Sequence, residues 1–330
     1  MSQDLAKCAA DRGIRYFLIS FVDLFGTLRA KLVPASAIGQ MQRDGAAFAG
    51  FATHLDLTPA DPDMFAIADP ASLIQIPWKP EIGWLAADLH IGGKPLEHAP
   101  RHVLKRQVAA AAASGYRMKT GVEAEFFVLR ADGLAVADEA DRQAKPCYDQ
   151  AALLRRYELI GAISDAMLEL GWAPYQSDHE DANGQFEMNW AYDDALITAD
   201  RHVFFKFMGK ELAGQHGLRA TLMPKPFMHL TGNGCHAHVS LWDHGGDITR
   251  STTPRASSAF PRSPTISSAA SSLMPRRSRG YSHRRSTASN RSTRRRPCRA
   301  PPGHPMQSAM AATTAPIWCA FRSPAGSNCG

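Results

Sequence analysis

The chain has 330 residues, a mass of 35.9 kDa and 45% hydrophobic residues, enough for one large core or two domains. No stretch approaches the roughly 20 apolar residues of a membrane helix, and the N-terminus is polar, so we expect a soluble, unexported protein. The six cysteines include no CxxC pair, which argues against a disulfide framework or a zinc site and favours a reducing cytoplasm.

The net charge of +6 comes from one end of the chain. Residues 247–330 contain 14 Arg, one Asp and neither Lys nor Glu, a net of +13, which leaves 23 basic and 30 acidic residues, a net of −7, in residues 1–246. Basic segments bind nucleic acid electrostatically, but this one lacks Lys and any helical or aromatic pattern. We therefore expect no nucleic-acid function.

Residues 1–246 alternate strand and helix patterns, as in an α+β protein. The first two strands, at 16–21 and 27–33, flank the turn Asp23–Gly26 and begin a small N-terminal β domain of about 95 residues. The later elements that we expect are helices at 99–114, 149–170 and 199–216, and strands at 121–129, 184–190 and 235–241.

The first candidate site is the sequence GVEAEFF at residues 121–127. In a strand, Glu123 and Glu125 project from one face, while Phe126 and its alternates enter the core. Two adjacent carboxylates repel each other, and a divalent cation with oxygen ligands removes that cost. An exposed strand face with two solvated acids would give the same pattern.

The second candidate site is HEDANGQFEMN at residues 179–189. A glycine-containing loop carries Glu180, and the strand that follows alternates Gln185, Glu187 and Asn189 with apolar residues. One face of this strand is therefore entirely polar. A solvent-facing amphipathic strand is the alternative explanation.

The third candidate site is TGNGCHAHVS at residues 231–240. Its glycines let the backbone come close to a ligand, and His236, His238 and Ser240 share one strand face. A pair of packed core histidines would produce the same spacing. The three alternative explanations would all have to hold together for the chain to lack a site.

Taken in order, GVEAEFFVL, HEDANGQFE and GNGCHAHVS resemble three successive strands that bind metal and nucleotide in glutamine synthetases. The resemblance covers about residues 10–246 and includes the turn Asp23–Gly26 and the sequence RDGAAFAGF at 43–51. The sequences HEDANGQFEMNW, MPKPF and KPCYDQ are most similar to the type III group, which includes relatives acting on methylamine.

The resemblance implies a fold and a reaction. The fold would be an N-terminal β-grasp domain at 1–95 and a catalytic domain at 96–246, built on an antiparallel open-barrel sheet with surrounding helices. In the reaction, ATP phosphorylates the γ-carboxylate of L-glutamate, and ammonia then displaces phosphate to give glutamine. The runner-up is a γ-glutamylmethylamide synthetase, which accepts methylamine, and a third possibility is an inactive regulatory homologue.

The resemblance also implies two Mg²⁺ or Mn²⁺ ions in each active site. Glu125, Glu180 and Glu187 match the ligands of the first ion, nearer glutamate and ammonia. Glu123 and His236 match two ligands of the second ion, nearer the ATP phosphates.

Further residues match positions that contact the substrates. Gly232 corresponds to a backbone contact with glutamate, and His238 and Ser240 lie in a stretch that lines ATP. Asp44 aligns with an acid that binds and deprotonates ammonium, and Glu187 is the second candidate for this role. Family members form homo-oligomeric rings with active sites between subunits, so Asp44 would act on a neighbouring subunit's site.

Beyond Gly246 the alternating pattern gives way to Ser, Arg, Pro, Ala and Thr. A disordered basic tail is one explanation. Another is a change of reading frame, which can be tested by rebuilding each residue from the third base of one codon and the first two bases of the next. The rebuilt frame forces Ala at 306–307, Gly at 310–311 and Val at 318–319, because Met and Trp codons end only in G.

The residues of the rebuilt frame that are not forced fit the same family as the forced ones. With free wobble bases, residues 300–322 admit GATWAPNAVSYGGNNRTHLVRIP and residues 326–330 admit RFELR, which resemble the C-terminal motifs of glutamine synthetases. We therefore expect a frame change close to Gly246 and no native fold in residues 247–330. The written chain would then lack the family's C-terminal arginines and the third ligand of the second metal.

Overall fold

The computed structural model describes residues 3–243 and 319–320. The helices and strands, in chain order, are α1 (Leu5–Arg12), β1 (Tyr16–Val22), β2 (Leu28–Pro34), η1 (Ala35–Ala37), α2 (Ile38–Asp44), β3 (Ala46–Phe48), η2 (Gly50–Ala52), β4 (Met64–Ala68), η3 (Pro70–Ser72), β5 (Ile74–Gln75), β6 (Ile82–Ile91), β7 (Lys94–Pro95), α3 (Pro100–Ala113), β8 (Tyr116–Arg130), α4 (Gln150–Arg155), α5 (Tyr157–Glu169), β9 (Pro174–His179), β10 (Gln185–Trp190), β11 (Asp193–Asp194), α6 (Ala195–Gln215), β12 (Leu218–Thr221), β13 (Cys235–Asp243) and β14 (Cys319–Ala320). Within this part of the chain, no helix has the length and apolar character needed to cross a membrane.

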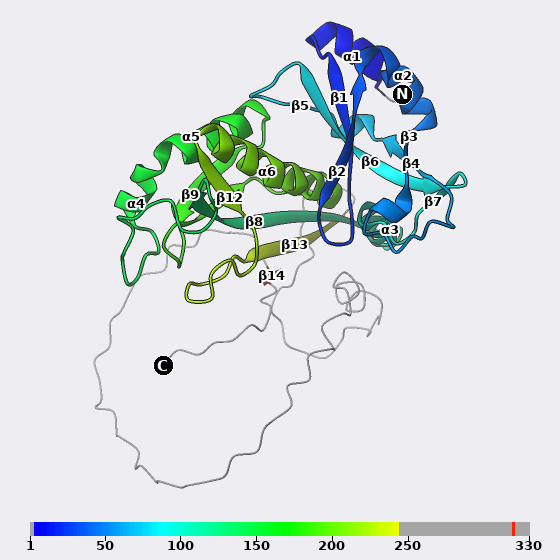
Figure 1. The fold of residues 1–330 in the computed structure, drawn as a ribbon. Coiled ribbons are helices and arrows are strands. Elements are labelled where there is room, and N and C mark those ends of the chain that lie inside the picture. The colour runs from blue at the N-terminus through cyan, green and yellow to red at the C-terminus, as the bar shows by residue number, and fades with distance from the viewer. Residues whose placement is uncertain (1–2, 244–318, 321–330) are drawn as a thin grey trace, which may run out of the picture. The chain divides into compact units, whose positions relative to one another are not determined.

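The N-terminal sheet has the strand order β2-β1-β6-β4-β3, with β5 and β7 also paired to β6. β1 and β2 form the predicted antiparallel hairpin, which projects as the long blue loop of Figure 1. β1 and β6 run parallel, so the sheet is mixed.

The turn of this hairpin is held by one buried carboxylate. Asp23 accepts hydrogen bonds from the backbone N–H of Phe25 at 3.0 Å, from that of Thr27 at 2.9 Å and from Nε of Arg29 at 3.0 Å. Gly26 has a φ of +74°, which a residue without Cβ adopts readily. The prediction of a hairpin at Asp23–Gly26 is therefore confirmed.

Strand β6 contributes to two hydrophobic cores. Leu85, Ala87 and Leu89 pack into the N-terminal core with β1 and β4. Trp84 and Ala86 point the other way and pack into the core beneath α5 and α6. Because successive strand side chains point to opposite faces, one strand joins the N-terminal sheet to the second layer of the protein.

The second sheet is antiparallel and centres on the long strand β8, which pairs with β10, β11, β12 and β13. Helices α5 and α6 lie over one face of this sheet (Figure 1). Ala124, Phe126 and Val128 of β8 are buried on that side. Glu123 and Glu125 therefore belong to the opposite face, as their alternation predicted.

The predicted strands at 121–129, 184–190 and 235–241 are confirmed, although β8 begins five residues earlier than expected. The predicted helix at 149–170 is instead two helices that meet at Arg156, whose φ and ψ are −114° and 12°. Arg155 binds the Asp138 carboxylate and Arg156 the Ala137 carbonyl. Successive side chains of a continuous helix point about 100° apart. The break at Arg156 lets both arginines reach residues 137–138. The expectations for residues 247–330 lie outside the described residues, apart from β14.

Candidate active site

Three neighbouring strands bring their polar side chains to one face of the second sheet. The register places Glu187 of β10 opposite Glu125 of β8, and Asn189 opposite Glu123. On the other side of β8, His236 of β13 is also opposite Glu123. Residues opposed in this way have Cβ atoms about 5 Å apart, so the three motifs of the sequence form a single site.

The acidic residues of this face form two clusters that share a member. Ligand atoms of Glu125, Glu180 and Glu187 lie within 4.8 Å of one another, and so do those of Glu123, Glu187 and His236. Glu180 reaches the first cluster from the loop between β9 and β10. These are the five residues that the sequence predicted as metal ligands, and Glu187 faces both positions.

The electrostatics of the face are unfavourable without a cation. Burial, opposed by the Asn189 hydrogen bond and reinforced by neighbouring carboxylates, raises the pKa of Glu187 to about 7. Burial also raises the pKa of Glu125, against the lowering effect of the Gly234 amide. Two ionised carboxylates opposite each other therefore need a positive partner.

The donor chemistry fits a hard divalent cation. Carboxylate oxygens dominate both clusters, with one imidazole in the second, which suits Mg²⁺ or Mn²⁺ better than a thiophilic metal. Two buried oxygens on the adjoining strands, Asp178 Oδ1 and Asn189 Oδ1, have no hydrogen-bond donor among the described residues. The register pairs Asp178 with Glu187, which puts Asp178 on the same face.

Glu125 is held in place by the glycine-containing motif after β12. Its Oε2 accepts a hydrogen bond from Gln185 Nε2 at 3.0 Å and another from the Gly234 amide at 2.7 Å. A Cβ at Gly234 would come within 2.6 Å of Glu125 Oε1. Only glycine allows the backbone to approach the carboxylate so closely.

Both histidines of the third motif contact Glu123. His236 Nδ1 lies 2.9 Å from Oε2, and His238 Nε2 lies 2.8 Å from Oε1. The sequence separated these histidines into a metal ligand and an ATP-lining residue. The structure brings both to one carboxylate at the second cluster, and the ATP-lining role of His238 stays a prediction.

Ser240 lies next to a pair of aromatic rings that the sequence did not single out. Trp242 Nε1 donates a hydrogen bond to Ser240 Oγ at 2.9 Å, and the Trp242 and Tyr192 ring centroids are 6.0 Å apart. Lys119 Nζ lies 4.1 Å from the Trp242 centroid. Aromatic faces next to a cation suit a nucleobase with an attached phosphate chain.

The remaining predicted residues lie in two places. Gly232 belongs to the loop before β13, and its carbonyl accepts a hydrogen bond from Gln185, the residue that also holds Glu125. Asp44 ends α2, which packs against α1 and β4 in the N-terminal part of the chain. No described hydrogen bond or ion pair joins Asp44 to either cluster.

Sequence reasoning also missed Asp178 and Tyr148. The negative charges of Asp178 and Glu180 raise the pKa of the exposed Tyr148 phenol. Its backbone N–H donates to the His179 carbonyl at 2.8 Å, which ties it to the loop of Glu180. Asp178 could have been found from the alternation along β9, because it lies two residues before Glu180.

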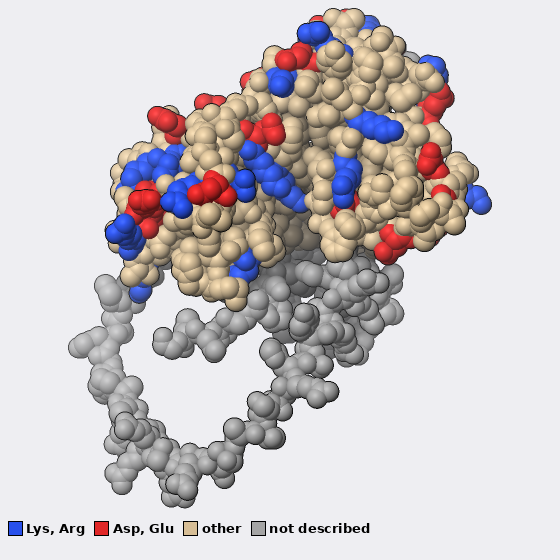
Figure 2. Space-filling view, viewed as in Figure 1, with Lys and Arg blue, Asp and Glu red and all other residues tan. Residues whose placement is uncertain are grey.

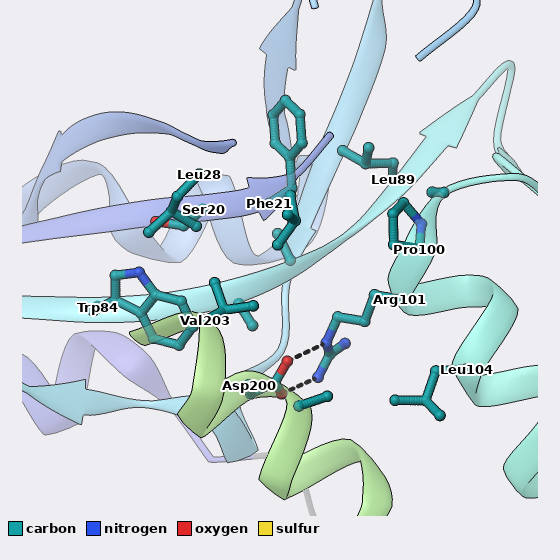
Figure 3. Close-up of a pocket in the computed structure, with 15 residues that line it drawn as sticks. Ser20, Phe21, Leu28, Trp84, Leu89, Pro100, Arg101, Leu104, Asp200 and Val203 are labelled. Atoms are coloured by element: carbon teal, nitrogen blue, oxygen red, sulfur yellow. Dashed lines mark hydrogen bonds and ion pairs between the residues drawn. The ribbon is translucent and has the colours of Figure 1, made fainter. Parts of the chain in front are cut away.

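A separate cavity of about 120 Å³ lies between the N-terminal sheet and helices α3 and α6 (Figure 3). Its walls are mainly apolar, and Arg101 and Asp200 at its edge bind each other through two hydrogen bonds, at 3.1 and 3.0 Å. None of the residues of the two acidic clusters lines it. The cavity is therefore separate from the acidic face of the second sheet.

Comparison with known families shows to which family the chain belongs. The family described as "Glutamine synthetase, catalytic domain" matches residues 97–263, about half of the chain. The chain belongs to the glutamine synthetase family. The matched segment contains all three motifs of the acidic face.

Individual members of the glutamine synthetase family agree with this assignment. A glutamine synthetase of Rhizobium leguminosarum bv. phaseoli is 64% identical over 248 residues, 75% of this chain and 57% of the relative. A glutamate–methylamine ligase of Methyloversatilis universalis is 42% identical over 234 residues, 70% of this chain and 53% of the relative. A solved structure described as apo GmaS without ligand is 63% identical, with a TM-score of 0.73, and covers 74% of this chain and 58% of that one. The chain thus matches little more than half the length of these relatives.

Proposed function

We propose that residues 1–246 are part of a glutamine synthetase that joins ammonia to the γ-carboxylate of L-glutamate at the expense of ATP. The observation that carries this proposal is the pair of clusters that share Glu187. A ligase of this kind has to bind a phosphate chain and a carboxylate side by side, and two adjacent cation positions bring those two anions together.

The residues of the acidic face would divide the two cations between them. Glu125, Glu180 and Glu187 would hold the first Mg²⁺ or Mn²⁺ ion, and Glu123 with His236 the second. When bound, the ions screen the negative charge of the phosphates and orient the group that is transferred. The pairing of β8 with β10 and with β13 places these side chains and so sets the distance between the two cation positions.

The substrates would lie along the same face. His238 and Ser240 would line ATP, with Tyr192 and Trp242 offering their rings to the base. Gly232 would contact glutamate through its backbone, from a loop that Gln185 ties to Glu125. In the first step a γ-carboxylate oxygen attacks the terminal phosphorus of ATP, which gives γ-glutamyl phosphate and ADP.

In the second step the nitrogen of ammonia attacks the γ-carbonyl carbon, and inorganic phosphate leaves with the electrons of the broken C–O bond. Ammonium has no free electron pair, so a carboxylate has to accept its proton first. Asp44 of a neighbouring subunit and Glu187 are the groups that we propose for this role. The separation of Asp44 from the clusters within one chain supports action between subunits of a homo-oligomeric ring.

The same machinery would serve a ligase that uses methylamine. This second candidate is favoured by the similarity to the glutamate–methylamine ligase. The sequence motifs that resemble the type III group also fit it. The two functions differ only in the amine. Competition of ammonia with methylamine in one assay, with both amide products quantified, decides between them, and a preference for methylamine above tenfold would overturn glutamine synthesis as the main activity.

Finer features of the protein belong to the same proposal. Residues 1–95 would form a β-grasp domain, residues 96–246 most of an open-barrel catalytic domain, and the protein would work in the cytoplasm without nucleic acid or membrane partners. On the face in view in Figure 2, acidic and basic side chains are interspersed over the described residues. Such a surface does not concentrate positive charge for a polyanion.

The proposal includes the change of reading frame close to Gly246. Resequencing the gene tests it directly, and one uninterrupted frame through residue 330 would refute it. We expect the frame-corrected protein to catalyse γ-glutamyl transfer and ATP-dependent amide formation, and the written chain to do neither. Transfer activity in the written chain equal to that of the corrected one would contradict this part of the proposal.

A further inference from the structure

A buried pair, Asp141 and His179, lies directly behind the acidic face. The side chains are 1% and 0% exposed, and Asp141 Oδ2 is 2.6 Å from His179 Nε2. The two residues are 38 positions apart in the sequence, and neither belongs to a cluster that could hold a metal. Placing a carboxylate in the interior is costly unless its hydrogen bonds are satisfied, so the pair needs a reason.

Asp141 closes the loop that carries Glu180. Its Oδ2 also accepts a hydrogen bond from the Gly184 amide at 2.6 Å, and its Oδ1 accepts one from Asn183 Nδ2 at 2.8 Å. One carboxylate thus binds both ends of the segment 179–184, which consists of the last residue of β9 and the loop before β10. Hydrogen bonds to an ionised carboxylate are about twice as strong as neutral ones, so the loop is pinned at both ends.

His179 extends this support to the backbone of Glu180. Its Nδ1 lies 3.0 Å from the Glu180 carbonyl oxygen, and the Glu180 amide donates to the Gln185 carbonyl at 2.9 Å. The backbone of Glu180 is therefore fixed on both sides of its Cα. Its carboxylate then meets Glu125 and Glu187 in the first cluster.

We propose that Asp141 and His179 are positioning residues that hold Glu180 in the geometry of the first cation position. Glu180 comes from a loop, whereas the backbones of Glu125 and Glu187 are fixed by strand pairing, so the backbone of Glu180 needs other hydrogen bonds to hold it. The inference rests on the proposed metal site, and it adds two residues that touch neither metal nor substrate.

The test measures Mn²⁺ binding to the full chain, by the loss of the electron paramagnetic resonance signal of free Mn²⁺ during titration. We expect Asp141→Asn to weaken the tightest Mn²⁺ site by about 10- to 100-fold, the usual effect of losing a group that orients a ligand. Asp138→Asn is the matched control, because Asp138 is also buried and lies three residues away. It binds Arg155 at 2.6 Å and makes no hydrogen bond to the segment 179–184.

A second pair of variants guards against a simple failure to fold. His179→Gln keeps an N–H group near Asp141 and should bind Mn²⁺ within about threefold of the wild type, whereas His179→Leu should match the loss of Asp141→Asn. Circular dichroism establishes which variants are folded, and Glu125→Gln identifies the tight site as the first cluster. Equal affinity in wild type and folded His179→Leu or Asp141→Asn would overturn the positioning role. Absence of Mn²⁺ binding in the wild type would overturn the metal site itself and this role with it.

Discussion

Glu187 faces both acidic clusters, so its titration contributes to the pH dependence of stability when no metal is bound. Its pKa is raised to about 7 in the folded chain, whereas an unfolded Glu titrates near about 4.3. Between these values the folded state keeps a proton that the unfolded state loses. The free energy of unfolding therefore decreases as the pH rises between the two pKa values, and the decrease is complete above pH 7.

We expect Glu187→Gln to raise the melting temperature of chelator-treated protein at pH 8 by about 2–4 °C, the shift that roughly 1 kcal/mol produces in a unit of this size. At pH 4.5 the two proteins should melt together, because the wild-type carboxyl is protonated there. Mn²⁺ at pH 8 should stabilise the wild type and not the variant. Scanning fluorimetry measures all three, and a gain of equal size at both pH values would contradict the assignment.

His202 of α6 gives the opposite response to pH. Burial and, less strongly, the charge of Lys206 lower its pKa to about 4, whereas an unfolded His titrates near about 6.5. Between these two pKa values the unfolded chain binds a proton at His202 that the folded chain does not. The free energy of unfolding is therefore unaffected by His202 above pH 6.5 and decreases as the pH falls towards 4.

The variant His202→Gln should flatten the fall of the melting temperature between pH 6.5 and 4.5. His229 is exposed, and His229→Gln serves as the control that should leave the profile unchanged. Melting curves at half-unit pH intervals make the comparison. A wild-type slope retained in His202→Gln would show that another group controls the acid response.

At the scale of elements, strand periodicity predicted which side chains share a face. Glu123 with Glu125, and Glu187 with its polar neighbours, follow the period of two, and β8, β10 and β13 are confirmed. The period alone also allowed solvated strand faces. What it left open was which strand lies beside which.

Strand pairing could not be read from the sequence, because it joins residues far apart along the chain. Glu187 meets Glu125 only through the β8–β10 register, and a shift of one residue would turn the carboxylates to the helix side. Asp141 was missed for the same reason, since its partners lie about 40 residues downstream. Helix 149–170 was predicted unbroken because local periodicity does not register the contacts of Arg155 and Arg156.

The β1–β2 hairpin gives a test at this scale. Asp23 is fully buried and accepts three hydrogen bonds within the hairpin, so we expect Asp23→Ala to lower the free energy of unfolding by about 2–3 kcal/mol. Asp61→Ala is the control, because Asp61 accepts two hydrogen bonds from Thr58 in an exposed turn and should have a much smaller effect. Urea unfolding measures both, and equal losses would mean that burial of Asp23 adds nothing.

At the scale of the whole molecule, the residues that we propose for the reaction lie in two parts of the chain. Asp44 is exposed at the end of α2, which packs against α1 and β4, while both acidic clusters lie on the second sheet. The N-terminal part also exposes large apolar side chains, with Phe25 78% and Phe51 54% exposed. The proposed ring would bring Asp44 of one subunit to the clusters of the next.

Mixing two inactive subunits of the frame-corrected protein tests whether Asp44 acts on a neighbour. Asp44→Asn and Glu187→Gln subunits should each be inactive alone, since each removes a group that we propose to accept the proton. If sites form between subunits in a ring, random co-assembly leaves both native groups in about a quarter of the sites, and about a quarter of the wild-type activity should return. Refolding each variant alone is the control. If Asp44 acted within its own chain, no mixed site would be complete, and the mixture would stay inactive.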